Sequence, residues 1–439
     1  MNYKGLSRAF TLSALFAAML PAMQANAAAF QVAEHSAAGV GRAFAGEAAT
    51  AEDASTIARN VAGMAFLDGP TFTGTVSYIK PNIEIENTTP TPTGLTDPNY
   101  PYGDYKGKVQ KDVAPAAVVP VFYYVTPVND KVSVGFAGYT NFGFSTEYDT
   151  ESGMTLPAKK SDIMTYNLNA SVAYKLQDNL SIGFGLNAVY LEAALSNVAL
   201  VAPDTFRTAL DMEGDDWSYN WSAGVLWQPL EHTRLGFSYT SEVDATLEGK
   251  NKSQVYNGTV VANVNPLGLN FNTNGSADLT LPSIAELSIL QQLNDQLSVH
   301  ASYQKIGWSS LEKLTIKLDG VPAAAHPEEI FEYKDVSRWS VGATYKYSED
   351  WTFRTGYAYD NSPVSDEHRS FRIPDGDREW FSVGASYTID SNQKLDAGYA
   401  YLTGKESEIH YTSSTGIKVD GKIKKSNAHI LSLQYNYKF

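Results

Sequence analysis

The sequence predicts an all-β membrane protein, a transmembrane β-barrel of about fourteen antiparallel strands with an N-terminal hatch in its lumen. Three observations lead to this fold class. Apolar and polar residues alternate along most of the chain after residue 69. Short and long connections between the alternating segments follow one another in turn. The preceding residues 28–68 are rich in Ala and Gly and lack the two-residue period.

The composition of the 439 residues excludes several classes of protein. Beyond the N-terminus, no stretch has the roughly 18 uninterrupted apolar residues that a membrane helix needs, which rules out a helical membrane bundle. The 27 tyrosines and 33 glycines suit strands and tight turns, and the absence of cysteine removes disulfides and thiolate metal sites. A net charge of −15 argues against a nucleic-acid partner, because phosphate binding needs clustered cations.

The first 27 residues contain the three parts of a cleaved signal peptide. Lys4 and Arg8 form a positive region, residues 9–23 are mainly apolar, and Ala25-Asn26-Ala27 matches an A-x-A cleavage site. The alternative is a short N-terminal helix of a cytoplasmic protein, which leaves the order of these three parts unexplained. We therefore expect residues 1–27 to be removed and the mature protein to be exported.

Residues 28–68 are predicted to form a compact hatch. Short stretches at 47–49 and 52–54 have local helical potential. The lumen of a fourteen-stranded barrel is too wide for its own side chains to fill, so a plug there makes physical sense. The alternative is a disordered leader, since such a composition can also remain unfolded.

Residues 69–439 are predicted to form the barrel. In the last segment Leu431 and Leu433 face one side while Ser432 and Gln434 face the other. A soluble β-sandwich has the same period, but its strands usually have about five or six residues. These alternations continue for about nine or more, as tilted membrane strands do. The predicted strands span residues 70–85, 113–126, 131–147, 161–176, 179–193, 215–228, 232–248, 278–291, 295–315, 334–347, 350–361, 378–389, 393–404 and 427–439.

The predicted connections indicate how the barrel lies in the membrane. Tight turns alternate with long polar loops along the chain, as they do in outer-membrane barrels with periplasmic turns and extracellular loops. An even number of strands places both ends of the barrel on the periplasmic side. Phe439, at the end of the last strand, resembles the signal that hands such barrels to their insertion machinery, which we expect to be a partner during biogenesis.

Two features predict the binding of an apolar substrate. Both faces of the predicted strand 113–126 are apolar, with Tyr123 on one face and Phe122 and Tyr124 on the other. The inner face either packs against the hatch or lines a cavity for an apolar substrate, which makes Phe122 and Tyr124 candidate ligand contacts. Predicted loops 193–214 and 248–277 carry apolar runs among polar residues, and exposed apolar patches usually bind something.

Motifs for catalysis and metal binding are missing from the sequence. No G-x-S-x-G elbow is present, and the seven histidines show no H-E-x-x-H spacing. Carboxylate runs such as 213–216 and 375–377 are more typical of loops facing solvent or lipopolysaccharide cations than of hydrolytic or calcium sites. We expect no enzyme activity, metal or cofactor. The alternatives from other classes are an outer-membrane lipase and a hydrophilic porin.

Several ordered motifs resemble the FadL family of long-chain fatty acid transporters. The similarity begins in the predicted hatch and spans nearly all of the mature chain. The motifs are Ala29-Phe30-Gln31, Gly39-Val40-Gly41-Arg42-Ala43-Phe44-Ala45-Gly46-Glu47, Ala51-Glu52-Asp53-Ala54-Ser55, Ala58-Arg59-Asn60-Val61-Ala62, Thr140-Asn141-Phe142-Gly143, Asn187-Ala188-Val189-Tyr190, Trp351-Thr352-Phe353-Arg354-Thr355-Gly356, Asp360-Asn361-Ser362-Pro363-Val364 and Ile373-Pro374-Asp375-Gly376-Asp377-Arg378.

This resemblance implies an outer-membrane barrel that takes up long-chain fatty acids passively. Substrate would be captured outside the cell, bound in an apolar pocket and released sideways into the membrane after the hatch moves. The family also includes uptake channels for aromatic hydrocarbons, which is the alternative function. We further expect contacts with outer-membrane lipid and lipopolysaccharide, and a monomer.

The resemblance also implies particular site residues. Phe30 would contact the ligand, because the mature N-terminus lines the pocket in the family. The kinked strand that creates the lateral opening matches Asn141-Phe142-Gly143, where glycine permits a break in strand geometry. The alternative is that Gly143 forms only a bulge.

The sequence departs from the family pattern at two places. The family's Asn-Pro-Ala hatch motif is Asn60-Val61-Ala62 here, which lacks the fixed dihedral of proline. The family arginine that faces a ligand carboxylate aligns with Asn197, which favours less charged ligands. Four predicted inward cations remain, and each either meets a ligand carboxylate or pairs with a carboxylate of the barrel wall. They are Arg338, Arg354, Arg378 and Lys346.

Overall fold

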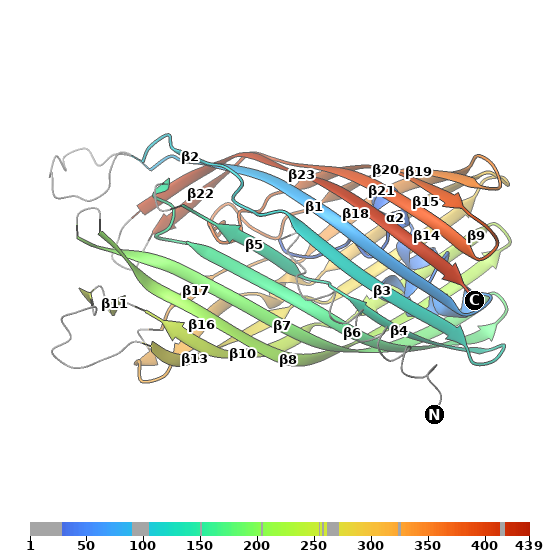
Figure 1. Cartoon of the computed structure of the whole chain (residues 1–439), viewed down its shortest axis with the longest axis horizontal. Coiled ribbons are helices and arrows are strands. Elements are labelled where there is room, and N and C mark those ends of the chain that lie inside the picture. Colours follow the sequence, from blue (N-terminus) through green and yellow to red (C-terminus); the bar gives the residue numbers. More distant parts are fainter. Residues whose placement is uncertain are drawn as a thin grey trace, which may run out of the picture.

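The fold is a closed antiparallel β-barrel (Figure 1), seen in a computed structural model of the chain. The structure describes residues 29–89, 105–149, 152–202, 205–253, 255–256, 259–260, 272–323, 326–412 and 418–439. The predicted signal peptide, residues 1–27, lies outside these residues. Among the described residues, none of the helices is long and apolar enough to cross a membrane.

Fourteen strands form the wall within the described part of the chain, which confirms the predicted fold class. Each pairs with its sequence neighbour, and β1 pairs with β23 from Thr71–Lys438 to Asn87–Gly421, which closes the cylinder. The described strand elements outnumber these fourteen, because several wall strands are split into shorter elements and because β11 and β12 pair only with each other. The elements are β1 (Thr71–Asn87), β2 (Val109–Gln110), β3 (Ala117–Pro127), β4 (Val132–Tyr139), β5 (Gly143–Glu147), β6 (Lys160–Gln177), β7 (Leu180–Ala202), β8 (Thr205–Leu230), β9 (Thr233–Thr240), β10 (Val243–Lys252), β11 (Val255–Tyr256), β12 (Thr259–Val260), β13 (Asn272–Leu281), β14 (Ile284–Gln292), β15 (Leu297–Ile306), β16 (Lys313–Leu318), β17 (Glu328–Ile330), β18 (Val336–Lys346), β19 (Trp351–Asp360), β20 (Arg378–Thr388), β21 (Gln393–Gly404), β22 (Ser407–Thr412) and β23 (Lys418–Lys438).

Several wall strands are interrupted where the sequence predicts continuity. The predicted strand 131–147 is split into β4 and β5, and 295–315 is split into β15 and β16 by the 3-10 helix η4 (Trp308–Ser310). Between β13 and β14 the chain passes through Pro282, which has no N–H to donate to a ladder. Backbone interruptions of this kind do not disturb the alternation of side chains, so the sequence pattern does not reveal them.

The prediction of a loop at residues 193–214 is wrong, because β7 and β8 continue through this segment as one long hairpin. Their pairing extends to Ala202–Thr205 and absorbs register shifts at Asn197/Val198 and Leu200/Ala202. Backbone hydrogen bonds therefore hold this segment despite its irregular side-chain pattern. The structure does not describe the side chains of residues 199–207 or most of the side chains in the predicted loop 248–277.

The two faces of the wall differ as alternation predicts. On β23, Leu431 and Leu433 are exposed, while Ser432 and Gln434 between them are buried. On the other wall strands, too, the residues on the outward face are apolar and exposed; examples are Val76, Phe136, Leu186, Trp339 and Val383. Polar side chains therefore face the lumen, and an apolar surface faces outward.

The hatch lies inside the barrel, shown in blue around the label α2 in Figure 1. It contains α2 (Ala37–Gly41), η1 (Glu47–Ala49), α3 (Thr56–Arg59) and η2 (Val61–Phe66). Inward polar groups of the wall bind its backbone. Ala37 N–H donates to Gln434 Oε1 at 2.9 Å, and Ser181 Oγ donates to the Ala62 carbonyl at 2.8 Å. The hatch is thus hydrogen-bonded to strands on different sides of the lumen.

Glycines in the wall let the hatch backbone approach closely. A Cβ atom at Gly356 would lie 2.0 Å from the Arg42 carbonyl oxygen, and one at Gly236 would lie 1.9 Å from that of Ala48. Neither position has room for a side chain. The hatch backbone therefore packs directly against wall backbone at these glycines, in the half of the barrel near the short turns.

The two ends of the barrel are distinct (Figure 1). The short turns and the C-terminus lie at one end, which we call the turn end, and β2, β11 and β22 lie at the other, the loop end. Outer-membrane barrels have short periplasmic turns and long extracellular loops, and on this basis we expect the turn end to face the periplasm. The hatch helices occupy the turn half of the lumen, and cavities remain in the loop half.

Candidate functional site

The candidate site begins where the N-terminal segment meets an interruption in the wall. Phe30 is fully buried, and its ring centroid lies 6.1 Å from that of Phe142, 5.4 Å from that of Phe144 and 4.6 Å from that of Trp308. Rings at these separations and tilted angles attract one another beyond simple burial. Phe30 is therefore anchored by aromatic residues from three segments of the wall.

The wall is incomplete beside this aromatic cluster. β3 pairs with β4 only from Phe122–Gly138 to Pro127–Ser133, and β5 pairs with β6. Among the described residues, no ladder pair joins β3 to β5. Residues 140–142 separate β4 from β5, and the predicted triplet Asn141-Phe142-Gly143 lies at this interruption.

The N-terminal segment satisfies the backbone groups freed by the interruption. Gln31 forms an antiparallel bridge with Phe142. Val32 N–H donates to the Asn141 carbonyl at 2.7 Å, and Gly143 N–H donates to the Phe30 carbonyl at 2.8 Å. Buried backbone groups are nearly always paired, so displacement of residues 30–32 would leave this part of the wall without partners.

An apolar cavity lies next to the cluster, and the empty space inside it, open solvent included, is about 640 Å³. Its lining comes from the hatch, from seven wall strands and from the connections that contain Leu311, Phe331 and Arg372. Arg372 is the one charged side chain in this lining. The lining residues are Phe30, Phe144, Ile163, Ala193, Leu195, Met212, Gly214, Leu247, Ala277, Leu279, Leu311, Leu314, Ile316, Phe331, Arg372 and Ile373.

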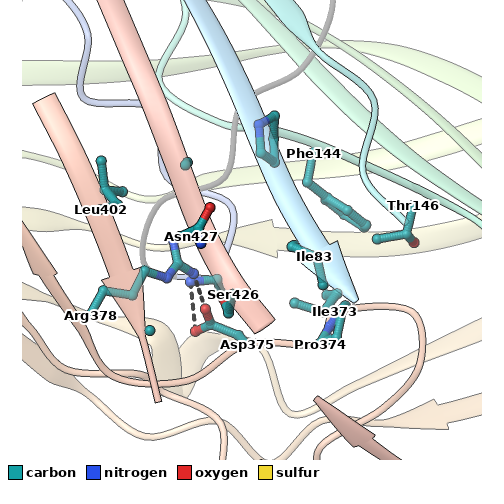
Figure 2. A pocket seen from close by; sticks show the side chains of 14 residues that line it. Ile83, Phe144, Thr146, Ile373, Pro374, Asp375, Arg378, Leu402, Ser426 and Asn427 are labelled. Atoms are coloured by element: carbon teal, nitrogen blue, oxygen red, sulfur yellow. Dashed lines mark hydrogen bonds and ion pairs between the residues drawn. The ribbon is translucent and has the colours of Figure 1, made fainter. Parts of the chain in front are cut away.

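A second cavity, of about 480 Å³, lies on the other side of Phe144 and Ile373, which line both spaces. Figure 2 shows its polar side, where Arg378 and Asp375 point toward one another as an ion pair. Asp375 Oδ2 also accepts from Ala29 N–H at 3.0 Å and from Ser362 Oγ at 2.7 Å. The start of the hatch is therefore tied to this ion pair, between the two cavities.

The predicted inward arginines are already paired with carboxylates. Arg338 lies 3.0 Å from Asp360, with both side chains buried. Arg354 lies 2.9 Å from Glu52 of the hatch, and Arg378 pairs with Asp375. Lys346 is exposed. The structure therefore favours ion pairing with carboxylates of the protein over contact with a ligand carboxylate for these arginines. Of the three, only Arg378 lines a cavity.

Three other predicted ligand contacts lie away from the apolar cavity. Phe122 and Tyr124 have the opposite parity to the buried Tyr123, and Phe122 is opposite Gly74 on the face that exposes Val76. These two rings therefore face outward, because a one-residue step in a strand reverses the side. Asn197 is half-buried at a register shift of β7 and does not belong to the cavity lining.

The hatch triplet Asn60-Val61-Ala62 keeps its local structure without proline. Asn60 caps η2, since its Oδ1 accepts from Ala62 N–H at 3.1 Å. Its Nδ2 donates to the Ala48 carbonyl at 2.7 Å and to the Val225 carbonyl of β8 at 3.0 Å. The asparagine thus supplies the start of the short helix and a contact to the wall.

Buried charges join the hatch to the wall. Glu52 lies 3.1 Å from Arg42 of the hatch and 2.9 Å from Arg354 of β19, and Arg42 also lies 2.8 Å from Glu47. Burial alone would raise the pKa of Glu52, but Arg354 and Arg42 outweigh it and hold that pKa well below its ordinary value. Glu52 is therefore ionised and electrostatically bound at neutral pH.

Sequence reasoning missed three residues of the site: Phe144, Trp308 and Arg372. Phe144 and Trp308 fall inside predicted strands, where only the interruptions turn them toward Phe30. Arg372 lies in the aperiodic connection before β20, adjacent to the quoted motif Ile373-Pro374-Asp375. That proximity was the one available signal. Within the described residues, no group of His, Asp or Glu is arranged to hold a metal ion.

Comparison with known proteins decides the family. Residues 18–439 match the family described as outer membrane protein transport protein (OMPP1/FadL/TodX). The chain belongs to this family. It is 33% identical over 459 residues to the long-chain fatty acid transport protein of Escherichia coli, covering 98% of this chain and 99% of that protein. It is 35% identical over 470 residues to outer membrane protein P1 of Haemophilus influenzae, with 98% and 99% covered.

Solved structures share the fold. A Pseudomonas aeruginosa FadL homologue has a TM-score of 0.81 at 27% identity, covering 93% of this chain and 99% of that one. The Ralstonia pickettii toluene transporter TbuX has a TM-score of 0.63 at 19% identity, covering 92% and 98%, and this likeness concerns the fold alone. The predicted resemblance to the FadL family is confirmed. As a member of the OMPP1/FadL/TodX family, the chain is an outer-membrane protein from a family of transporters rather than enzymes.

Proposed function

We propose that this protein takes up long-chain fatty acids through the outer membrane by passive diffusion. The observation that carries the proposal is the apolar cavity of about 640 Å³, bordered by Phe30, next to the interruption between β4 and β5. An apolar space beside a wall without a complete ladder fits a route for a hydrophobic molecule. The named relative from Escherichia coli supports the substrate class.

The proposed route has three steps. The loop end of the barrel captures the substrate, the apolar cavity binds it, and movement of residues 30–32 opens a side port beside Asn141-Phe142-Gly143. Burial of the acyl chain supplies about 0.8 kcal/mol per methylene, which gives affinity but no direction. Net inward flux then depends on consumption of the fatty acid inside the cell.

Uptake of labelled oleate by cells that lack their own transporter tests the proposal. Cells expressing this protein should take up oleate, and Ala277→Trp, which fills the apolar cavity, should lower that uptake strongly. The matched control is Ala170→Trp, which adds the same ring to the exposed wall face opposite Phe136 and should leave uptake unchanged. Equal uptake by both variants would contradict a route through the cavity.

The second candidate function is uptake of aromatic or other uncharged hydrocarbons. The pairing of Arg338, Arg354 and Arg378 with carboxylates favours it, because these cations are not free for an acidic ligand. The fold shared with the toluene transporter TbuX is compatible with it. The same cells, supplied with labelled toluene, distinguish the candidates: toluene uptake without oleate uptake would favour the second.

We also infer the surroundings of the protein. The exposed apolar parity of the wall suits contact with outer-membrane lipid, and the loop end suits lipopolysaccharide. The exposed C-terminal Phe439 supports recognition by the barrel insertion machinery, and a single closed barrel is consistent with a monomer.

A further inference from the structure

The two cavities in the loop half of the barrel are separated by a few side chains. Phe144 and Ile373 are the two residues that belong to both linings. The N-terminal segment passes between the same spaces, since Ala29 lines the second cavity and Phe30 lines the apolar one. All four residues are buried. We call Phe144 and Ile373 the partition, because their side chains face both spaces.

Ile373 is the fixed side of the partition. Its carbonyl accepts from Asp375 N–H at 2.9 Å, and the preceding carbonyl, that of Arg372, accepts from Thr146 Oγ1 at 2.9 Å. The Arg372 side chain also binds the wall, where its Nη1 donates to Ser161 Oγ at 3.1 Å. The backbone around Ile373 therefore cannot shift without breaking hydrogen bonds on both sides of it.

Phe144 is the movable side of the partition. Its ring has no polar atom, and the ring centroid lies 5.4 Å from that of Phe30 at an interplanar angle of 39°. The residue follows directly after Gly143, at the interruption between β4 and β5. The Phe144 ring can therefore change rotamer without breaking a hydrogen bond, and what it loses is its packing against Phe30 and the other apolar neighbours.

The second cavity offers further apolar surface beside the partition. Figure 2 shows Ile83 and Ile373 on the same side of this cavity as Phe144, with Arg378 on the other side. Further apolar residues of the lining are Pro81, Pro374, Leu402 and Ala428. A hydrocarbon chain that passes the Phe144 ring therefore enters next to carbon side chains and not next to the ion pair.

We propose that Phe144 selects the chain length of the hydrophobic substrate. A short chain fits in the apolar cavity and leaves the ring in place. A longer chain displaces the ring and extends into the second cavity. This inference rests on the proposed function and adds the residue that sets how long a chain the protein accepts.

Displacement of the Phe144 ring also weakens the anchor of the N-terminal segment. Phe30 packs against the rings of Phe142, Phe144 and Trp308, and residues 30–32 bind the interruption of the wall. A chain long enough to move Phe144 removes one of these ring contacts from Phe30, whereas a short chain removes none. Phe144 thus links the length of the ligand to the release of residues 30–32.

The test measures binding of decanoate, myristate and stearate to full-length protein in lipid nanodiscs. The acids differ only in their number of methylene groups, and partitioning of each acid into the lipid is the same for every variant. Each methylene newly buried raises affinity about four-fold. Phe144→Ala should therefore raise the ratio of stearate affinity to decanoate affinity about ten-fold or more. Ile373→Ala widens the partition from its fixed side and should raise the same ratio in a barrel that keeps the Phe144 ring.

Phe371→Ala is the matched control, because it removes a buried phenyl ring two residues from Ile373 and lines neither cavity. It should leave the ratio unchanged. An unchanged ratio in both Phe144→Ala and Ile373→Ala, or an equal rise in Phe371→Ala, overturns the role of the partition while the proposed function stands. Failure of the unaltered protein to bind any of the three acids removes the proposed function itself.

Hydrogen exchange of residues 30–32 tests the link to the wall. In the unaltered protein, saturating stearate should make exchange of these amides faster than saturating decanoate does. In Phe144→Ala the two acids should have the same effect, since no ring remains to be displaced. Equal exchange with both acids in the unaltered protein would overturn the displacement of Phe144 by a long chain.

Discussion

At the scale of single residues, His35 couples the hatch to the interrupted wall. Its Nε2 lies 2.9 Å from the Thr140 carbonyl, which only accepts, so Nε2 carries the hydrogen. Nδ1 is buried with no partner among the described residues. Burial, together with the positive charge of Arg59, lowers the pKa of His35 from 6.5 to about 3. His35 is therefore neutral in the folded hatch.

This shift predicts that mild acid loosens the hatch. A histidine whose folded pKa is lowered contributes stability that is complete above pH 6.5 and is lost as the pH falls toward 3, at about 1.4 kcal/mol per pH unit. The cost at pH 5 is therefore about 2 kcal/mol. Hydrogen exchange of residues 29–66, corrected for intrinsic rates, should become faster at pH 5 than at pH 7.5.

The control for this prediction is His35→Gln, which cannot titrate and should lose the acid effect. The neighbouring Glu34 has the opposite tendency, because burial raises its pKa and favours the folded state as the pH falls. Identical pH dependence in the altered and unaltered proteins would assign the effect to a group other than His35.

At the scale of elements, the important feature is that residues 30–32 act as a short extra strand at the interruption of the wall. Gln31 and Phe142 form a non-hydrogen-bonded antiparallel pair, flanked by the bonds from Val32 to Asn141 and from Gly143 to Phe30. Such pairs have Cα atoms about 4.5 Å apart, which suits a disulfide. The chain contains no cysteine of its own.

A cross-link at this pair should therefore block transport. In the double variant Gln31→Cys/Phe142→Cys, the oxidised protein should lose most of its oleate uptake, because residues 30–32 can no longer leave the interruption. Reduction should restore uptake to the level of the two single variants, which control for loss of the native side chains. Full uptake by the oxidised double variant would show that this segment does not have to move.

The strands could be predicted from the sequence, whereas the interruption of the wall could not. Alternation along β6 or β20 predicts the position of each strand and which of its faces points into the lumen. The reason is that the pattern depends only on the polarity of the environment on each side of the wall. The interruption between β4 and β5 depends on hydrogen bonds made with residues 30–32, far away in sequence, and no local pattern encodes it. Arg372 was missed for the same reason: its position beside the cavity depends on contacts with distant Ser161, Ser196 and Glu329.

At the scale of the whole molecule, ion pairs buried between hatch and wall hold the two parts together. Arg354 of β19 lies between Glu52 of the hatch and the buried Asp396 of β21, at 2.9 and 3.6 Å. Removing one member of a buried ion pair leaves its partner uncompensated and costs about 3–5 kcal/mol. Because Glu52 is partly exposed, the lower end of this range is expected here.

Arg354→Gln should therefore unseat the hatch and make the barrel permeable. The expected result is a larger single-channel conductance in planar bilayers than that of the unaltered protein. Lys317→Gln provides the control, since its ion pair with Asp278 is exposed and should contribute less than about 1 kcal/mol. An unchanged conductance in Arg354→Gln would mean that other contacts suffice to retain the hatch.

The bare wall backbone at Gly236 and Gly356 has a consequence for how ligand preference changes over evolution. These positions accept no side chain, so the turn half is constrained to one arrangement. The cavity in the loop half is lined by different residues, such as Leu279 and Ile316, which tolerate substitution without disturbing that arrangement. The same barrel can therefore change its ligand preference through substitution of a few apolar side chains in the loop half, while the hatch and its packing against the wall stay the same.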